Sequence, residues 1–422
     1  MASTDMAAGV DAPLRQELHD LLTRFAAFGA TPGGGVRRLT GTPEDGAARD
    51  LLAATLRAAG AEVVADPIGN EFGVFRLPGA GESVVLVGSH LDGQPTGGRF
   101  DGTYGVVAAV VAARAVAARL AATGAVARHH LAVVNWTNEE GARFQPSLTG
   151  SSVFIGSLTA EAALALADEA GTTLGEALAA IGWRGGGRLG LEPVRAVELH
   201  VEQGDGLERA GVGIGLVTGA WAARKLCLNF VGEPSHTGPT PMARRRDALR
   251  AAARAVEALY GLVEADGRGA HASAARLTIW PNSPNVVASD VRVWFEIRHP
   301  EETVTDGLAA RFLAAAADGA GPLGVAVETA IDERRAPLAF DRDGIETVRA
   351  AAAALGHAAI ETTTVAGHDV LALQRRLPGT LIFVPSRDGL GHNEREFTEP
   401  ADLERGLEVL AETLWRMVAD VG

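Results

Sequence analysis

Histidine and aspartate stand close together in a glycine-rich segment, residues 88–102, that follows a strand-like run. Asp92 lies two residues after His90, so an extended chain places both side chains on one side. A metal-bound histidine commonly needs a nearby carboxylate to orient its ring. The segment therefore predicts His90 as a metal ligand oriented by Asp92, with a polar surface loop as the alternative interpretation.

Two neighbouring acids, Glu139 and Glu140, follow a second strand-like run at residues 130–135. Adjacent carboxylates repel each other, so holding both at a strand end destabilises the fold unless a cation is present. One acid could bind a metal while the other works as a base. A solvated acidic turn is the alternative interpretation.

Three further histidines lie in polar segments. His200 shares one strand face with Glu202, and His392 follows glycine, which leaves room for a metal to approach. His368 precedes Asp369, which indicates either a pair that supports the site or the start of a helix. A structural role explains each histidine alone equally well, but together they predict a metal site.

Alternating strands and helices must position these residues. This pattern predicts an α/β fold with a central, mostly parallel sheet flanked by helices. The clusters come directly after strands, where such sheets place their sites. A helix is expected from Pro43 to Ala59, because Thr42 can cap it and Pro43 suits its first turn.

The middle of the chain has a different order of elements. It reads βαββαβ, the split ferredoxin-like unit, and predicts an inserted domain at residues 219–334 within a domain formed by residues 1–218 and 335–422. The expected elements are strand 224–231, helix 242–265, strands 275–280 and 286–297, helix 303–317 and strand 324–331. One stripe of the first helix would hold Leu249, Ala252, Ala253, Val256 and Leu259.

Composition limits the class of protein. With 422 residues and 47% apolar residues, a globular chain of two domains is expected. The net charge is 38 − 52 = −14, which argues against nucleic acid and anionic membranes as partners. The single cysteine, Cys227, and residues 1–15, which lack the apolar run of a signal peptide, favour a cytoplasmic protein. The apolar run at 106–120 is expected to be a buried helix, too short to span a bilayer.

The motifs, taken in order, resemble those of the M20 metallopeptidase/amidohydrolase superfamily. The similarity covers nearly the whole chain and is strongest to the branch of N-carbamoyl-L-amino acid hydrolases, β-ureidopropionases and allantoate amidohydrolases. The matching segments are residues 35–36, 42–45, 88–102, 136–144, 200–204, 235–247, 281–287, 298–300, 367–369 and 383–398.

The resemblance implies two divalent metal ions that share one carboxylate, Asp101. His90, Asp101 and His200 would hold one ion, and Asp101, Glu140 and His392 would hold the other. Zinc is favoured, while manganese, cobalt and nickel stay open, because oxygen and nitrogen ligands do not decide among them.

The resemblance also implies the remaining roles. Glu139 would be the general base, and Gln203 would line the substrate site. The inserted domain would act as a lid and as the surface of a homodimer. Three of its residues would bind a small, carboxylate-bearing substrate, namely His236, Asn285 and Arg298. Arg298 would pair with the substrate carboxylate, and His236 would help to stabilise the oxyanion.

The implied activity is hydrolysis of N-carbamoyl-L-amino acids to the amino acid, carbon dioxide and ammonia. Within the superfamily, an allantoate amidohydrolase, a dipeptidase or an N-acyl amino acid deacylase is the alternative. A non-catalytic metal-binding protein on the same fold is a further one, and the retention of Glu139 beside every ligand argues against it.

Overall fold

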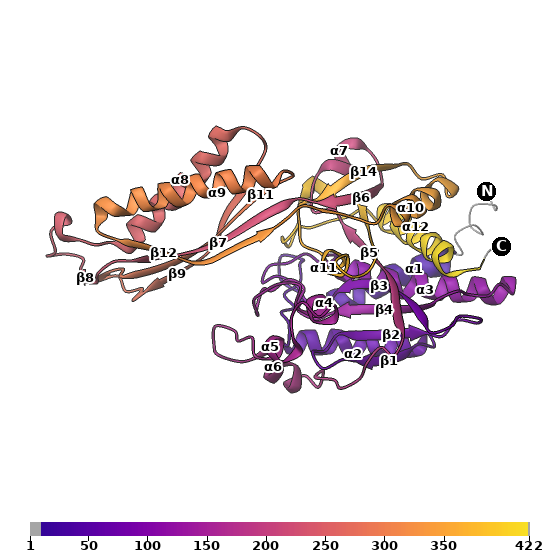
Figure 1. Ribbon diagram of the computed structural model, residues 1–422. Coiled ribbons are helices and arrows are strands. Elements are labelled where there is room, and N and C mark those ends of the chain that lie inside the picture. Colours follow the sequence, from indigo (N-terminus) through magenta and orange to yellow (C-terminus); the bar gives the residue numbers. More distant parts are fainter. Residues whose placement is uncertain (1–9, 421–422) are drawn as a thin grey trace. The chain divides into compact units, whose positions relative to one another are not determined.

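The computed structural model describes residues 10–420, which form two compact units (Figure 1). The first comprises the chain up to Thr218 and from Phe340 onward, and the second is Gly219–Ala339. Residues 1–9, most of the segment in which no signal peptide is expected, lie outside the described part of the chain.

A nine-stranded sheet forms the centre of the first unit. Its order is β1 (Glu62–Ala65), β2 (Glu71–Phe75), β4 (His130–Trp136), β3 (Ser83–His90), β5 (Glu192–Val201), β15 (Gly379–Val384), β6 (Ile214–Ala220) and β13 (Leu338–Ala339), with β14 (Ala359–Thr364) beside β6. The neighbours β4, β3, β5 and β15 are parallel, and the pairs toward both edges are antiparallel. This confirms the predicted central, mostly parallel sheet.

Helices pack against this sheet. The long ones are α1 (Ala12–Ala26), α2 (Pro43–Ala58), α3 (Thr103–Thr123), α10 (Arg342–Ala354) and α12 (Pro400–Val418). Short ones are α4 (Thr149–Phe154), α5 (Ala160–Leu164), α6 (Leu174–Ala180), α7 (Gly206–Ala210) and α11 (Asp369–Leu373). Helix α2 begins where the sequence predicts, because the Thr42 side chain accepts a hydrogen bond from the Asp45 amide.

Helix α3 is longer than the sequence predicts. Its 21 residues are enough, by length and composition, to cross a membrane, and 67% of its most apolar window is buried inside the protein. Val106 to Ala113 are all buried, and the helix contacts β3, β5 and α12. Its apolar character is therefore explained by its place in the core.

The second unit is a four-stranded antiparallel sheet in the order β12 (Ala326–Arg335), β7 (Ala222–Val231), β11 (Asp290–His299) and β9 (His271–Trp280). Helices α8 (Ala248–Asp266) and α9 (Glu302–Ala320) share one core with it. The chain order is βαββαβ, and the sheet order, numbered along the chain, is 4-1-3-2. The unit therefore has its own hydrophobic core.

Three details of the second unit differ from the sequence prediction. Helix α8 begins at Ala248, because the Asp247 side chain caps it, and residues 242–244 form a separate 3-10 turn. Leu249 is consequently 40% exposed, and the buried stripe is Ala248, Ala251, Ala252, Ala255 and Leu259. The strand expected at 286–297 is split into β10 (Val286–Val287), which pairs with β8 (Ser235–His236), and β11.

The boundary of the insertion also differs from the prediction at its C-terminal end. The sequence predicts an end at residue 334, but the unit continues to Ala339. The reason is backbone pairing, since Leu338 and Ala339 lie opposite Ala220 and Gly219. The first and last residues of the inserted segment are thus neighbours.

Candidate metal centre

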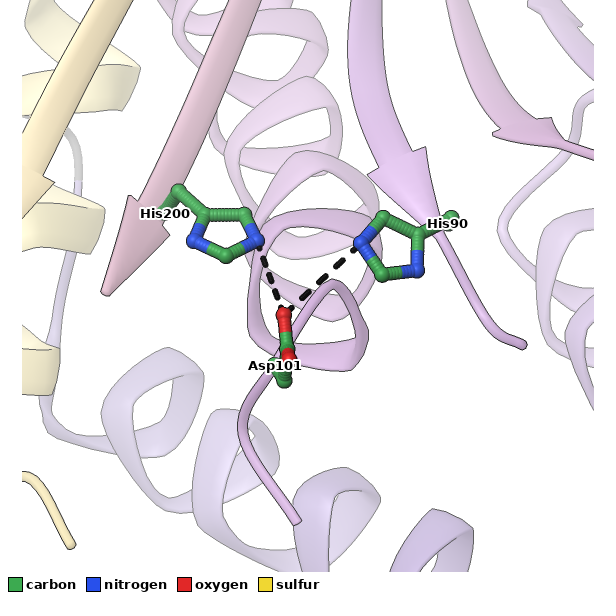
Figure 2. Close-up of side chains that lie close together, drawn as sticks. All are labelled: His90, Asp101 and His200. Atoms are coloured by element: carbon green, nitrogen blue, oxygen red, sulfur yellow. Dashed lines mark ion pairs between the residues drawn. The ribbon is translucent and has the colours of Figure 1, made fainter. Parts of the chain in front are cut away.

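His90, Asp101 and His200 come together at one edge of the central sheet. His90 ends β3, and His200 lies near the end of the parallel neighbour β5, so both side chains reach the carboxyl edge of the sheet. Asp101 precedes α3, and its Oδ1 lies 3.2 Å from His200 Nε2 and 3.8 Å from His90 Nε2. Figure 2 shows the carboxylate pointing between the two rings.

The other oxygen of Asp101 faces a second group of side chains. Asp101 Oδ2 lies 3.3 Å from His392 Nε2, which is also 3.3 Å from Glu140 Oε2. His392 is the exposed member, since its side chain is 52% exposed whereas that of Asp101 is 5% exposed. One carboxylate therefore presents one oxygen to each of two clusters.

These distances fit a metal ion in each cluster. Two ligand atoms at about 2.1 Å from a tetrahedral ion stand about 3.4 Å apart, and the four Asp101 and His392 contacts fall between 3.2 and 3.8 Å. Glu140 Oε1 is buried and accepts no hydrogen bond from the described residues. The donors are imidazole and carboxylate without thiolate, a set that suits zinc, manganese, cobalt or nickel.

Backbone carbonyls orient both buried imidazole rings. His90 Nδ1 lies 2.8 Å from the carbonyl oxygen of Asp92, and His200 Nδ1 lies 2.8 Å from that of Val201. A carbonyl only accepts hydrogen bonds, so Nδ1 carries a proton. In the neutral form of the ring, which metal binding requires, the Nε2 lone pair is then the one that faces Asp101. That orientation is the one a metal ligand requires.

The carboxylate of Asp92 has a different partner from the expected one. It lies 3.9 Å from His90 Nδ1, whereas its oxygens accept the amide hydrogens of Glu139 at 3.1 Å and Glu140 at 3.3 Å. Thr40 Oγ1 donates a third hydrogen bond, at 3.0 Å. Asp92 thus orients His90 through its backbone, and its side chain holds the turn that carries the two glutamates.

Glu139 is the buried acid beside the first cluster. Its Oε2 lies 3.6 Å from His90 Nε2, and the residue is 6% exposed. Burial, followed by the nearby carboxylates of Asp369 and Glu140, raises the pKa of Glu139 well above its usual range. Burial would also raise the pKa of Asp101, but His200 and His392 hold it well below its usual value. One acid is thus suited to carry a proton and the other to stay charged.

Several buried polar residues behind the site are not indicated by the sequence motifs. Glu198 accepts hydrogen bonds from Ser89 Oγ at 2.7 Å and from the Val370 amide at 2.9 Å. Glu396 accepts the amide hydrogens of Phe100 and Asp101, at 3.0 and 3.1 Å. The available signal for Glu198 is its spacing of two from His200, which puts both on one strand face.

The predicted pair His368 and Asp369 lies beside the site and also begins a helix. The ring centre of His368 is 4.7 Å from that of His200. Asp369 accepts a hydrogen bond from Ser151 Oγ and starts α11. The pair therefore lies beside the site and also starts a helix, so both roles that the sequence allows are found in this structure.

Gln203, the residue expected to line the substrate site, donates a hydrogen bond to Asp101 Oδ2 at 2.9 Å.

The three predicted lid residues belong to the second unit. His236 lies on β8 opposite Val286 of β10, and the Asn285 carbonyl accepts the Thr237 amide at 3.2 Å, so His236 and Asn285 are on adjoining segments. Arg298 stands on another element, near the end of β11, where its Nη2 donates to Glu296 Oε2 at 2.7 Å.

A mixed α/β sheet with parallel central strands and two histidine–carboxylate clusters joined by one aspartate, together with an inserted antiparallel unit, defines a metal-dependent hydrolase. The profile of peptidase family M20/M25/M40 matches residues 86–416. The chain belongs to this family.

Relatives of known name agree with that class. The chain is 36% identical to the N-carbamoyl-L-amino-acid amidohydrolase of Rhizobium meliloti, over 93% of this chain and 94% of that protein. It is 31% identical to the allantoate amidohydrolase of Bacillus subtilis, over 96% of this chain and 98% of that protein. A crystal structure of a hydantoinase/carbamoylase family amidase from Burkholderia vietnamiensis superposes with a TM-score of 0.88 at 39% identity, covering 97% of this chain and 99% of that one.

Proposed function

We propose that this protein hydrolyses the carbamoyl C–N bond of N-carbamoyl-L-amino acids, releasing the amino acid, carbon dioxide and ammonia. The observation that supports this most directly is the shared carboxylate of Asp101, with one oxygen toward each histidine cluster. The relatives named as N-carbamoyl-L-amino-acid amidohydrolases support the choice of substrate.

His90, Asp101 and His200 would hold one divalent ion, and Asp101, Glu140 and His392 the other. When bound, such ions polarise the scissile carbonyl and lower the pKa of water. Glu139 takes a proton from the attacking water and then delivers it to the leaving nitrogen, which suits a carboxyl whose pKa is raised by burial. Asp92 fixes the turn from which Glu139 acts.

The second unit would supply the groups that recognise the substrate. Arg298 is proposed to pair with the substrate carboxylate, since a guanidinium binds a carboxylate with two parallel hydrogen bonds. His236 and Asn285 would contact the carbamoyl group of the substrate, and His236 would do so at the carbonyl oxygen. Gln203 would line the site from the first unit, where it already contacts Asp101. We further propose a cytoplasmic homodimer that associates through the second unit.

Allantoate amidohydrolase is the second candidate function. The relative of that name in Bacillus subtilis supports it, and allantoate likewise carries a carboxylate and ureido groups. The elements Gln94-Pro95-Thr96 and Arg298-His299-Pro300 favour the carbamoylase, because they resemble that group more closely.

An ammonia-release screen tests the proposal. The protein is reconstituted separately with zinc, manganese, cobalt and nickel and supplied with N-carbamoyl-L-amino acids, their D-enantiomers, allantoate and N-acetyl amino acids. Release of ammonia from the N-carbamoyl-L-amino acids above all others is expected. Faster turnover of allantoate would select the second candidate. Hydrolysis of an N-acetyl amino acid gives acetate and no ammonia, so it is followed by release of the free amino acid, and turnover of these substrates alone would exclude both.

A further inference from the structure

The sheet of the second unit carries a concentrated group of cations on the face away from its helices. On β7, Arg224 points toward the helices, because it pairs with Asp306 of α9 at 2.6 Å. Residues alternate faces along a strand, so Ala223 and Lys225 point to the opposite face. Lys225 is the only lysine of the chain, which has 422 residues and a net charge of −14.

Two arginines flank Ala223 on this face. The strand register places Arg298 of β11 directly opposite Ala223 on one side and Arg335 of β12 directly opposite it on the other. Side chains of directly opposed residues project to the same side of a sheet, and neighbouring strands are about 4.8 Å apart. The guanidinium groups of both arginines can therefore reach a small anion lying over the methyl group of Ala223.

The next register row holds the counter-charges. Glu296 and Glu333 lie on either side of Lys225. Glu296 accepts the 2.7 Å hydrogen bond from Arg298 through Oε2, while its Oε1 is buried and accepts no hydrogen bond from the described residues. Burial raises the pKa of Glu296, and the charges of Arg298, Lys225 and Arg335 outweigh it and hold the pKa below its usual value. All three cations are thus close to this one carboxylate.

We propose that Arg335 and Arg298 together form the binding site for the substrate carboxylate, with Glu296 as a positioning residue that fixes the Arg298 guanidinium. This inference rests on the proposed function, to which it adds a second cationic residue. The register places only the methyl group of Ala223 between the two arginines, and Nε and Nη2 of Arg335 are buried. In this proposal the substrate carboxylate would lie over Ala223, between the Arg298 and Arg335 guanidinium groups.

The adjacent residue Arg334 provides a matched control. It carries the same charge one position earlier, on the opposite face, where its Nε lies 3.4 Å from Asp306 Oδ1 and its side chain is 60% exposed. Arg335→Gln, Arg334→Gln and Arg335→Lys are compared in the metal-loaded protein, with thermal unfolding to verify that each variant folds. Steady-state kinetics use an N-carbamoyl-L-amino acid and its carboxamide analogue, which lacks the carboxylate charge.

The expected result is a KM for the carboxylate substrate that rises about 10- to 100-fold in Arg335→Gln, with kcat changed far less. The KM for the carboxamide should stay unchanged, so the variant should lose most of its preference for the carboxylate substrate over the carboxamide. Arg335→Lys should recover part of the effect, because lysine keeps the charge but not the two parallel donors. Glu296→Gln should raise the same KM by a smaller factor.

Two outcomes separate this inference from the proposed function. If the wild-type protein turns over the substrate and Arg335→Gln behaves like Arg334→Gln, the two-arginine site is wrong while the proposed function holds. If the wild-type protein releases no ammonia from any ureido carboxylate, the proposed function fails. Calorimetric titration of the same carboxylates into wild-type and Arg335→Gln protein then decides the anion site, and equal affinities would overturn it.

Discussion

Three buried carboxylates near the candidate metal centre have different surroundings, and the surroundings separate their proposed chemical roles. Asp101 faces two histidines and keeps its charge. Asp92 accepts two backbone amides and a hydroxyl, so it holds a turn in place. Glu139 lies among other carboxylates and is suited to carry a proton. Residue type alone does not distinguish these roles, because all three are acids on neighbouring loops.

Glu139→Gln tests the proposed proton transfer. The amide keeps the size of the side chain but cannot accept the proton of water, so kcat is expected to fall by about 10²- to 10⁴-fold. The metal content, measured by plasma mass spectrometry, should match that of the wild type. Glu161→Gln, which alters an exposed carboxylate of the same unit in α5, should retain full turnover. A kcat within a few-fold of the wild-type value in Glu139→Gln would refute the base assignment.

Glu71, at the start of β2, gives a prediction for stability against pH. Burial raises the pKa of this carboxyl from 4.5 to about 8. The folded protein then binds a proton that the unfolded chain has lost, so the stabilising contribution is complete below about pH 4.5 and declines until about pH 8. The decline amounts to roughly 1.4 kcal/mol for each unit of pKa difference.

Glu71→Gln removes this titration. Denaturant unfolding at a series of pH values from 4.5 to 8 should show the free energy of unfolding of the wild type falling relative to that of the variant. The variant keeps a neutral side chain, as the folded wild type does at pH 7. Parallel profiles for the two proteins would show that Glu71 is charged in the fold.

The five candidate ligands are implied by the resemblance to the M20 superfamily, whereas the residue pattern alone indicates only histidines and acids at strand ends and in glycine-rich loops. The structure brings all five side chains together. The sequence does not identify the carbonyl of Asp92 as the partner of His90. That choice depends on the turn after β3, which brings the carbonyl within 2.8 Å of the ring while the carboxylate lies 3.9 Å away. Glu396 escapes such reasoning because its partners are distant in sequence. The spacing of Glu198 from His200 indicates its strand face, but its partner, the Val370 amide, is equally distant in sequence.

At the scale of elements, Gly102 joins the loop that carries Asp101, a candidate metal ligand, to helix α3. It precedes the helix with φ 61°, a left-handed conformation that favours glycine. A β-carbon at this position would lie 2.4 Å from Cε1 of His90 and 2.5 Å from its backbone oxygen. The junction thus sets both the start of the helix and the position of the His90 ring.

Gly102→Ala is expected to displace His90 and to weaken metal binding at least tenfold, in addition to a backbone strain of about 1–2 kcal/mol. Gly124→Ala is the control, because Gly124 ends the same helix with φ 69° and a β-carbon added there would meet no atom within 4 Å. Both variants should lose stability, but Gly124→Ala should bind zinc like the wild type in competition with a chelator. Equal zinc affinities would show that the His90 ring tolerates the methyl group.

Helices with a clear cap are predicted well from the sequence. Thr42 and Pro43 mark the start of α2, and the same logic applied to Asp247 would place the start of α8 correctly. The prediction instead starts this helix at Met242 and assigns Leu249 to its buried face, whereas Leu249 is 40% exposed in the structure. The break between β10 and β11 depends on pairing with β8, which the sequence pattern does not indicate.

At the scale of the whole molecule, the chain enters and leaves the second unit at adjacent positions. Ala220 and Leu338 are antiparallel partners, so the two ends of the inserted segment are adjacent. The unit also has its own core of β-sheet and helix residues. Both observations indicate that the first unit does not need the insertion to close its own chain.

Replacing residues 221–337 with an Asn-Gly turn tests this independence, because such a turn joins two antiparallel strands. The shortened chain should fold cooperatively and bind the same number of metal ions per chain as the full protein. Its turnover of carbamoyl substrates should fall at least 100-fold, because Arg298 and His236 are lost. Full turnover by the shortened chain would show that these residues have no part in the reaction.

The proposed homodimer can be tested through the exposed apolar side chains of the second unit. Trp280 is 68% exposed and Leu277 43% exposed on β9, an edge strand of the sheet. Exposed apolar groups on an unpaired edge favour association. Light scattering should give twice the chain mass for the wild type, and the mass of one chain for Trp280→Glu combined with Leu277→Glu. A wild-type protein with the mass of one chain at micromolar concentration would exclude the dimer.

The lone lysine on β7 has a practical consequence. An amine-directed fluorophore has only one side chain to react with, and that side chain belongs to the same face as Arg298 and Arg335. Labelling needs no engineered cysteine, and the rate at Lys225, separated from that of the α-amine by peptide mapping, would report whether a bound anion shields that patch from solvent.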